Sequence, residues 1–196
     1  MTPFFFGYGS LVNRATHTYA NAHRASATGW RRAWRYTRHR QVAFLTAVPC
    51  PDGRIDGLMA EVPNGDWIAL DEREYAYDRI AATSHVDHAL DLPHNVSIYA
   101  IAAGDHHAPT MDHPILLSYL GTVVQGYFNE FGEDGVKAFF DTTSGWEAPI
   151  LDDRHQPIYP RAQTLRHAES TLLESHMQRL GCHVIEAQAH APSTPS

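Results

Sequence analysis

The sequence predicts a single α+β domain. Segments of β-prone residues fill most of the first hundred positions, and the longest helical periodicity follows residue 115. The chain of 196 residues is long enough for one domain with a sizeable core, and we find no linker or internal repeat. We therefore expect one domain over residues 1–186 and a disordered tail, rich in Ala, Pro, Ser and Thr, over residues 187–196.

The first predicted strand ends in three consecutive phenylalanines at residues 4–6. An unbroken apolar run indicates a strand buried on both faces, since a half-exposed strand would alternate. Two glycines then free the backbone where the strand stops. The segment suits a tight turn whose N–H groups converge on a ligand carboxylate or carbonyl, and an ordinary strand-ending turn is the alternative. The residues of this turn are Gly7, Tyr8, Gly9, Ser10 and Leu11.

Three more strands are predicted before residue 63. A strand over residues 23–36 is expected to bend at Gly29. Residues 41–48 and 55–62 are expected to pair as a hairpin, because residues 49–54 contain the turn sequence Pro-Asp-Gly.

A local cluster of arginines accompanies the strand over residues 23–36. It alternates with aromatic residues, which predicts the solvated face of a strand; a surface that stacks on nucleic acid is the alternative. The formal net charge of −7 gives no general basic excess, so we expect no nucleic-acid partner. The cluster comprises Arg31, Arg32, Arg35, Arg38 and Arg40.

The most informative predicted helix covers residues 66–77. One stripe of this helix, at intervals of three and four residues, comprises Trp67, Leu70, Glu74 and Tyr77. A carboxylate on a core-facing stripe destabilises the fold unless it is hydrogen-bonded, paired or lines a pocket. Glu74 is therefore either paired with a nearby arginine, Arg73 or Arg79, or a general base at the edge of a pocket.

The rest of the chain alternates strands and helices. We expect neighbouring strands at 79–86 and 96–102, helices at 115–131, 133–140 and 162–180, and an edge strand at 182–186. Gly132 and Gly181 are expected to end helices. The loop-like segment at 142–160 is long enough to suggest a lid or a dimer contact.

Several common chemistries lack their motifs in this sequence. Gly7 and Gly9 do not complete a dinucleotide fingerprint, and no P-loop lysine or nucleophile elbow follows them. His85 and His88 fall at a strand end with a spacing that points them to opposite faces, so we expect no metal site there. The cysteines, Cys50 and Cys182, lie far apart. Together with the short apolar opening and the absence of any long apolar run, they favour a reducing, cytoplasmic location without membrane contact.

Three stretches together resemble the γ-glutamylcyclotransferase-like (AIG2/ChaC-like) family over roughly residues 4–131. They are Gly-Tyr-Gly-Ser-Leu at 7–11, Leu-Asp-Glu-Arg-Glu-Tyr-Ala-Tyr-Asp-Arg at 70–79, and Ser118-Tyr119 followed by Gly126. The resemblance implies a small mixed β-barrel or strongly curved sheet flanked by helices, with a pocket at its mouth. Tyr75 departs from the family pattern, in which a glycine often follows the catalytic glutamate, and so does the long C-terminal extension.

The resemblance also implies a reaction and a site. The α-amino group of a γ-glutamyl compound (amino acid, amine or glutathione) would attack its own γ-carbonyl, releasing 5-oxoproline without a metal or organic cofactor. Glu74 would move the proton, the 7–11 turn would hold the substrate through its N–H groups, and Tyr119 would contact the substrate. A non-catalytic binding module of the same fold and a hydrolase that releases glutamate are the alternatives. The expected partner is the small γ-glutamyl molecule, and a homodimer is left open.

Overall fold

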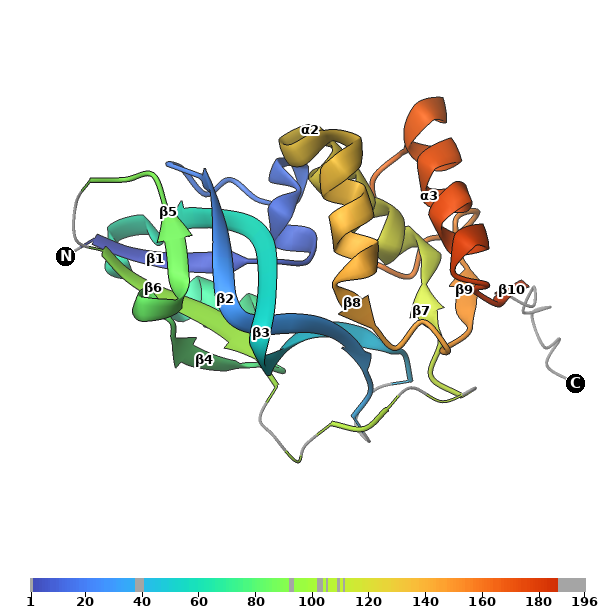
Figure 1. The fold of residues 1–196 in the computed structure, drawn as a ribbon, viewed down its shortest axis with the longest axis horizontal. Coiled ribbons are helices and arrows are strands. Elements are labelled where there is room, and N and C mark those ends of the chain that lie inside the picture. Colours follow the sequence, from blue (N-terminus) through green and yellow to red (C-terminus); the bar gives the residue numbers. More distant parts are fainter. Residues whose placement is uncertain are drawn as a thin grey trace, which may run out of the picture.

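The computed structural model describes residues 2–37, 41–91, 94–101, 104, 106–108, 110 and 112–186 (Figure 1). The main sheet is mixed and curls into a half-barrel, with helices packed at one end. Its strands run in the order β4-β6-β1-β3-β2-β5, and a short strand, β8, pairs with β2. These strands are β1 (Thr2–Gly7), β2 (His23–Arg35), β3 (Phe44–Glu61), β4 (Asp78–Ala81), β5 (Val86–His88), β6 (His94–Ala100) and β8 (Thr143–Ser144).

A second sheet and three α-helices complete the described part of the chain. The small sheet has the order β10-β9-β7 and lies beside the helices. Its strands are β7 (Ile115–Leu116), β9 (Ile150–Asp152) and β10 (Val184–Glu186), and the helices are α1 (Ile68–Arg73), α2 (Leu117–Asp141) and α3 (His167–Arg179). The strand expected over 182–186 is therefore confirmed as an edge strand, whereas the predicted tail over 187–196 falls outside the described residues.

β1 is central in the main sheet, as its phenylalanines predict. It pairs antiparallel with β3 and parallel with β6. Phe6 is buried in the large core beneath the helices, whereas Phe5 is buried in a smaller cluster with Leu70 and Tyr99. Apolar side chains on both faces explain the unbroken run, because neither face of this strand meets water.

The predicted hairpin between residues 41–48 and 55–62 is wrong. Residues 44–61 form one long strand, and both of its halves pair with β2: Leu45 lies opposite Trp34, and Ile55 lies opposite Ala27. The residues between the two halves accommodate a register shift rather than a chain reversal. On β2 the same bend falls at Gly29, whose φ of 81° suits glycine, so the predicted bend there is confirmed.

The helical half agrees in part with expectation. Gly132, with φ 69° and ψ −163°, interrupts α2 where a helix end is predicted, and helix resumes after it. The first two residues assigned to that helix form β7 instead. The strand expected over 79–86 is divided into β4 and β5 by a 3₁₀ turn at Thr83–His85, and α3 begins at His167, later than predicted. The segment 142–160 contains β8 and β9, which pair with separate sheets.

The predicted solvated face of β2 is wrong for Arg32, which is 1% exposed. Its guanidinium lies over the rings of Tyr127 and Phe139, at 4.8 and 5.4 Å from their centroids. Helix α2 therefore covers the face of β2 that carries Arg32 and Trp34. Arg31 and Arg35 are more accessible, and Arg38 and Arg40 fall outside the described residues.

Candidate functional site

The turn at residues 7–11 leaves the centre of the main sheet and enters a short 3₁₀ helix, Ser10–Val12. A Cβ on Gly7 would lie 2.5 Å from the Leu11 Cβ, and a Cβ on Gly9 would lie 2.7 Å from the Tyr119 hydroxyl. Both glycines are therefore required by close approach. The turn brings its backbone directly against Tyr119 on α2.

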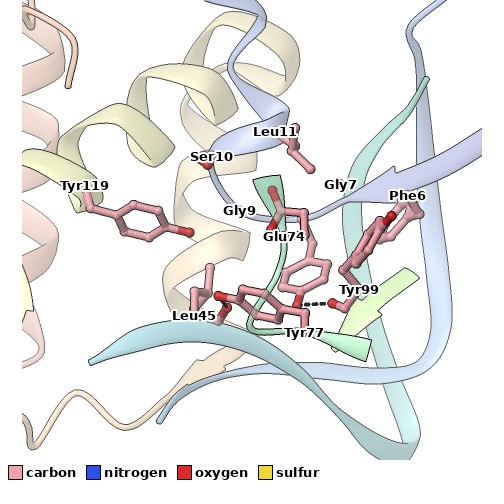
Figure 2. Close-up of a pocket in the computed structure, with 11 residues that line it drawn as sticks. Phe6, Gly7, Gly9, Ser10, Leu11, Leu45, Glu74, Tyr77, Tyr99 and Tyr119 are labelled. Atoms are coloured by element: carbon pink, nitrogen blue, oxygen red, sulfur yellow. Dashed lines mark hydrogen bonds between the residues drawn. The ribbon is translucent and has the colours of Figure 1, made fainter. Parts of the chain in front are cut away.

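A cavity of about 30 Å³, the inner cavity, lies at this turn (Figure 2). All the residues that the sequence singled out for the site line it: Gly7, Tyr8, Gly9, Ser10, Leu11, Glu74 and Tyr119. Figure 2 shows the Glu74 carboxylate beside the turn, with the Tyr119 hydroxyl directed toward it from the α2 side. The remaining lining residues, Phe6, Leu45, Tyr77 and Tyr99, were not predicted, although Tyr77 shares the helical spacing that drew attention to Glu74.

Glu74 reaches the cavity from a turn rather than from a helix interior. Helix α1 ends at Arg73, and Glu74, with φ −101° and ψ 26°, is its C-terminal cap. The predicted helix over 66–77 is thus too long. The chain must reverse at Glu74 because Asp78 begins β4, and the Tyr77 hydroxyl, at 3.0 Å from the Leu45 carbonyl, fixes the exit of the turn on β3.

An ion pair holds the Glu74 side chain. Arg73 Nε lies 3.1 Å from Glu74 Oε1, and the two side chains are 9% and 17% exposed. The same guanidinium donates to the Thr16 carbonyl at 3.0 Å. Arg79 instead lies 3.3 Å from Asp71. Both sequence interpretations of Glu74 are therefore compatible with its position: it is paired with Arg73, and it lines a pocket.

The phenols around Glu74 are kept protonated. Burial raises the pKa of Tyr119 well above its ordinary value, and the charges of Tyr159 and Glu74 add to the effect, while a backbone hydrogen bond from Ser10 opposes it. Burial is likewise the largest cause of the raised pKa of Tyr8. The Tyr8 hydroxyl donates to the Tyr99 carbonyl at 2.5 Å. At neutral pH Tyr119 therefore presents a neutral hydroxyl beside the Glu74 carboxylate.

A larger cavity of about 310 Å³, the outer cavity, shares Ser10, Glu74, Tyr77 and Tyr119 with the inner one. Its remaining walls are Val42, Ala43, Phe44, Arg73, Tyr75, Leu116, Tyr159, Pro160 and Arg161. Two of its three charged residues are arginines. This composition favours a ligand that carries an anionic group outside the inner cavity.

The far wall of the outer cavity comes from the segment after β9. Tyr159 packs edge-on against Tyr119, with ring centroids 5.0 Å apart. Asp153, which is 2% exposed, accepts hydrogen bonds from the Ser118 N–H at 2.8 Å, from the Ser118 hydroxyl at 2.5 Å and from the Ile158 N–H at 2.9 Å. One buried carboxylate thus ties this segment to the start of α2, next to Tyr119. The end of the segment 142–160 forms a wall of the outer cavity, and its roles as a lid or a dimer contact stay predictions.

Side chains that could ligate a metal do not cluster in the part of the chain that the structure describes. In that part of the chain, no three His, Cys, Asp or Glu side chains gather closely enough to hold a metal ion. No described helix has both the length and the apolar character needed to cross a bilayer. The site therefore offers a carboxylate, phenols, arginines and backbone donors as its chemical groups.

Comparison with known families adds to this geometry. A family model described as gamma-glutamyl cyclotransferase, AIG2-like, matches residues 5–132. The chain belongs to this family. No curated protein matches the sequence. The family assignment agrees with the resemblance drawn from the three sequence motifs, all of which lie within the matched residues.

Several solved structures resemble the chain at low sequence identity. A human protein, uncharacterized protein loc79017, has a TM-score of 0.55 at 12% identity, with 87% of this chain and 97% of that chain covered. YkqA from Bacillus subtilis has a TM-score of 0.54 at 15% identity, covering 74% of this chain and 56% of that one. A structure named gamma-glutamyl cyclotransferase has a TM-score of 0.50 at 11% identity, covering 89% and 99%. These likenesses confirm the predicted fold class.

Two features of this cyclotransferase-family chain affect the outer cavity. Tyr75, which follows Glu74 where a glycine is frequent, is 75% exposed and stands at the cavity rim. Tyr159, Pro160 and Arg161 lie beyond the matched residues 5–132. The inner cavity is thus built from the family's own segment, whereas part of the outer wall belongs to the C-terminal extension.

Proposed function

We propose that the chain cyclises a γ-glutamyl compound to 5-oxoproline. In this reaction the α-amino nitrogen attacks the γ-carbonyl carbon of the same molecule, and the bond from that carbon to the leaving amine breaks. Nucleophile and electrophile belong to one molecule, so holding the chain folded back on itself lowers much of the barrier. The products are 5-oxoproline and the free amine, and atoms balance without water or a redox partner.

Glu74 is the proposed general acid and base. The α-amino group is mostly protonated at neutral pH and must lose a proton to attack. The carboxylate can accept that proton and pass it to the leaving nitrogen. The single observation that carries the proposal is that Glu74 lines the same cavity as the 7–11 turn and Tyr119. Base, backbone donors and phenol thus surround one small volume.

The turn at residues 7–11 is proposed to stabilise the charge that develops on the γ-carbonyl oxygen. Leu11 lies in the first turn of the 3₁₀ helix, and the first N–H groups of a helix have no acceptor within it. Backbone donors that are already oriented stabilise an oxyanion without reorganising during the reaction. The reacting carbonyl would lie at the inner cavity, and the leaving group would extend into the outer cavity beside Arg73 and Arg161.

A binding module without turnover is the second candidate, and the Arg73–Glu74 ion pair is the observation that favours it. A carboxylate fixed by an arginine can serve the fold alone. The two candidates differ in one respect: a catalytic Glu74 must exchange a proton with the ligand, whereas a structural Glu74 need only remain charged.

Product analysis tests the proposal. The purified chain would be incubated with glutathione, γ-glutamyl amino acids and γ-glutamylamines, and 5-oxoproline would be sought by mass spectrometry. We expect 5-oxoproline from the native chain and a loss of about 100-fold or more in Glu74→Gln, which keeps the volume but cannot take the proton. Glu72→Gln, on the exposed face of α1, is the matched control and should retain activity.

Each outcome of this experiment has a distinct meaning. Free glutamate in place of 5-oxoproline would indicate hydrolysis. A folded Glu74→Gln variant with native activity would contradict the role of Glu74. Binding of a γ-glutamyl compound without product would support the module instead.

A further inference from the structure

Arg32 has an unusual environment for a fully buried charge. None of the ion pairs among the described residues includes it. Its hydrogen-bond acceptors are neutral oxygens: the Tyr8 carbonyl at 3.1 Å from Nε, the Thr142 hydroxyl at 2.7 Å from Nη1, and, from Nη2, the Asp56 carbonyl and the Tyr127 hydroxyl. Burying a guanidinium without a carboxylate is unfavourable, so these neutral contacts must compensate for the lost hydration.

One of those acceptors belongs to the site. The Tyr127 hydroxyl lies 2.9 Å from the Tyr8 carbonyl and 2.7 Å from the Asp56 carbonyl, so its single proton is shared between these two acceptors. Arg32 Nε is the further donor to the Tyr8 carbonyl. Neither Arg32 nor Tyr127 lines the inner or the outer cavity. Both are buried, so they contact the turn from the protein core rather than from a cavity wall.

The other end of the same peptide group is the Gly9 N–H. In a trans peptide the carbonyl and the following N–H point in opposite directions across a planar unit. A carbonyl held on the core side therefore directs the Gly9 N–H toward the cavity side. Among the described residues, no hydrogen bond uses this N–H as donor. The positively charged guanidinium that donates to the carbonyl oxygen also polarises the peptide and strengthens its N–H as a donor.

We infer that Arg32, together with Tyr127, is a positioning residue that orients and polarises the Tyr8–Gly9 peptide, so that the Gly9 N–H becomes a donor to the reacting carbonyl oxygen. This inference rests on the proposed function for the identity of the reaction. Arg32 touches neither substrate nor Glu74 in this arrangement, and it acts through a single backbone group. It accounts for the burial of a charge where the sequence pattern places a solvated one.

The test compares Tyr127→Phe and Arg32→Lys with Thr142→Val. Tyr127→Phe removes the hydroxyl that the Tyr8 and Asp56 carbonyls share and keeps the ring, and Arg32→Lys keeps the charge but loses the planar fork. Thr142→Val is the matched control, because it removes a hydrogen bond to the guanidinium that lies away from Tyr8. We expect kcat to fall about 10-fold or more in the first two variants, with KM changed little. The Gly9 N–H is proposed to act on the transition state, and a misoriented donor stabilises that state less. Thr142→Val should keep the native kcat.

A spectroscopic signature separates positioning from general destabilisation. In a ¹⁵N–¹H spectrum of the ligand-free chain, the Gly9 amide should shift in Tyr127→Phe and stay in place in Thr142→Val. Native kcat and an unmoved Gly9 resonance in Tyr127→Phe would overturn the inference, as would equal losses of kcat in Tyr127→Phe and Thr142→Val. Absence of 5-oxoproline from the native chain would contradict the proposed function. The Gly9 resonance alone would then decide whether Arg32 and Tyr127 orient the Tyr8–Gly9 peptide.

Discussion

Arg73 and Glu74, neighbours in the chain, share a charge-assisted hydrogen bond of 3.1 Å at the wall of the outer cavity. Through its other nitrogens Arg73 also donates to the carbonyl and hydroxyl of Thr16. The carboxylate is therefore anchored to the 3₁₀ segment that follows the 7–11 turn. Base and backbone donors are linked by one guanidinium, so their relative positions do not depend on the short helix α1 alone.

Removing this anchor should impair the proposed reaction while leaving most of the fold intact. We expect Arg73→Gln to lower kcat/KM about 10-fold to 100-fold, because a misplaced catalytic group can cost that much in rate. Steady-state kinetics with the best substrate of the panel measures the effect. Arg79→Gln, which removes the neighbouring ion pair with Asp71, is the control and should stay near the native rate. Equal rates in Arg73→Gln and the native chain would show that Glu74 needs no anchor.

The close approach of Gly9 to Tyr119 predicts coupling between the two positions. Gly9→Ala places a methyl group 2.7 Å from the Tyr119 hydroxyl, which should lower the free energy of unfolding by about 1–3 kcal/mol. In a Tyr119→Phe background the oxygen is absent, and the cost of Gly9→Ala should be smaller. Denaturant unfolding of the four proteins measures the coupling. The same cost in both backgrounds would contradict the close approach.

Asp153 should stabilise the wall that carries Tyr159. In Asp153→Asn an amide NH₂ replaces one of the two oxygens that accept from Ser118 and Ile158. The new NH₂ then faces a backbone N–H of one of these residues, and two donors meet without an acceptor. We expect the free energy of unfolding to fall by about 1–3 kcal/mol and KM to rise more than kcat falls. Unfolding curves and initial rates check both effects. Asp152→Asn removes a carboxylate that pairs with the exposed Arg154, and this variant should change KM little. An equal rise of KM in Asp152→Asn would contradict the role of Asp153 in holding the wall that carries Tyr159.

His17 should make the fold less stable in mild acid. Burial lowers the pKa of this imidazole below its ordinary value of 6.5, and the nearby charges of Arg73 and Arg14 also lower it. The unfolded chain therefore binds the proton more readily, and stability falls as pH decreases through and below that ordinary value. Between about pH 8 and pH 5, the Tm of His17→Gln should decline less than that of the native chain. His155→Gln, at an exposed position, should follow the native profile.

Local chemistry in the sequence predicted the inner cavity better than the outer one. The 7–11 turn and Glu74 could be found because each breaks a local pattern: two glycines after an apolar run, and a carboxylate on an apolar stripe. Tyr159 breaks no pattern, and it reaches Tyr119 only because Asp153 binds two distant segments. The family model matches the part of the chain that carries the three motifs.

The two clearest errors have the same physical origin. Arg32 was assigned to water with the other arginines of its cluster, although a period of two residues places it on the same face of β2 as Trp34, and α2 covers that face. Residues 49–54 were assigned to a hairpin turn because Pro and Gly favour reversal, yet β3 continues when β2 offers partners along its whole length. Both outcomes were decided by partners far away in sequence: α2 in the first case and β2 in the second. Local propensity carries no information on such partners.

The parallel pairing of β1 with β6 bears on the order in which the molecule folds. Phe4 lies opposite Val96, so the strand that carries the 7–11 turn is incomplete until a segment from the middle of the chain docks beside it. Parallel pairing between distant segments contributes to a high contact order and is slow to form. During synthesis, therefore, β1 emerges before β6 and would reach its final environment only after β6 has followed. Phe4 to Phe6 would remain an apolar segment in need of protection until β6 has left the ribosome.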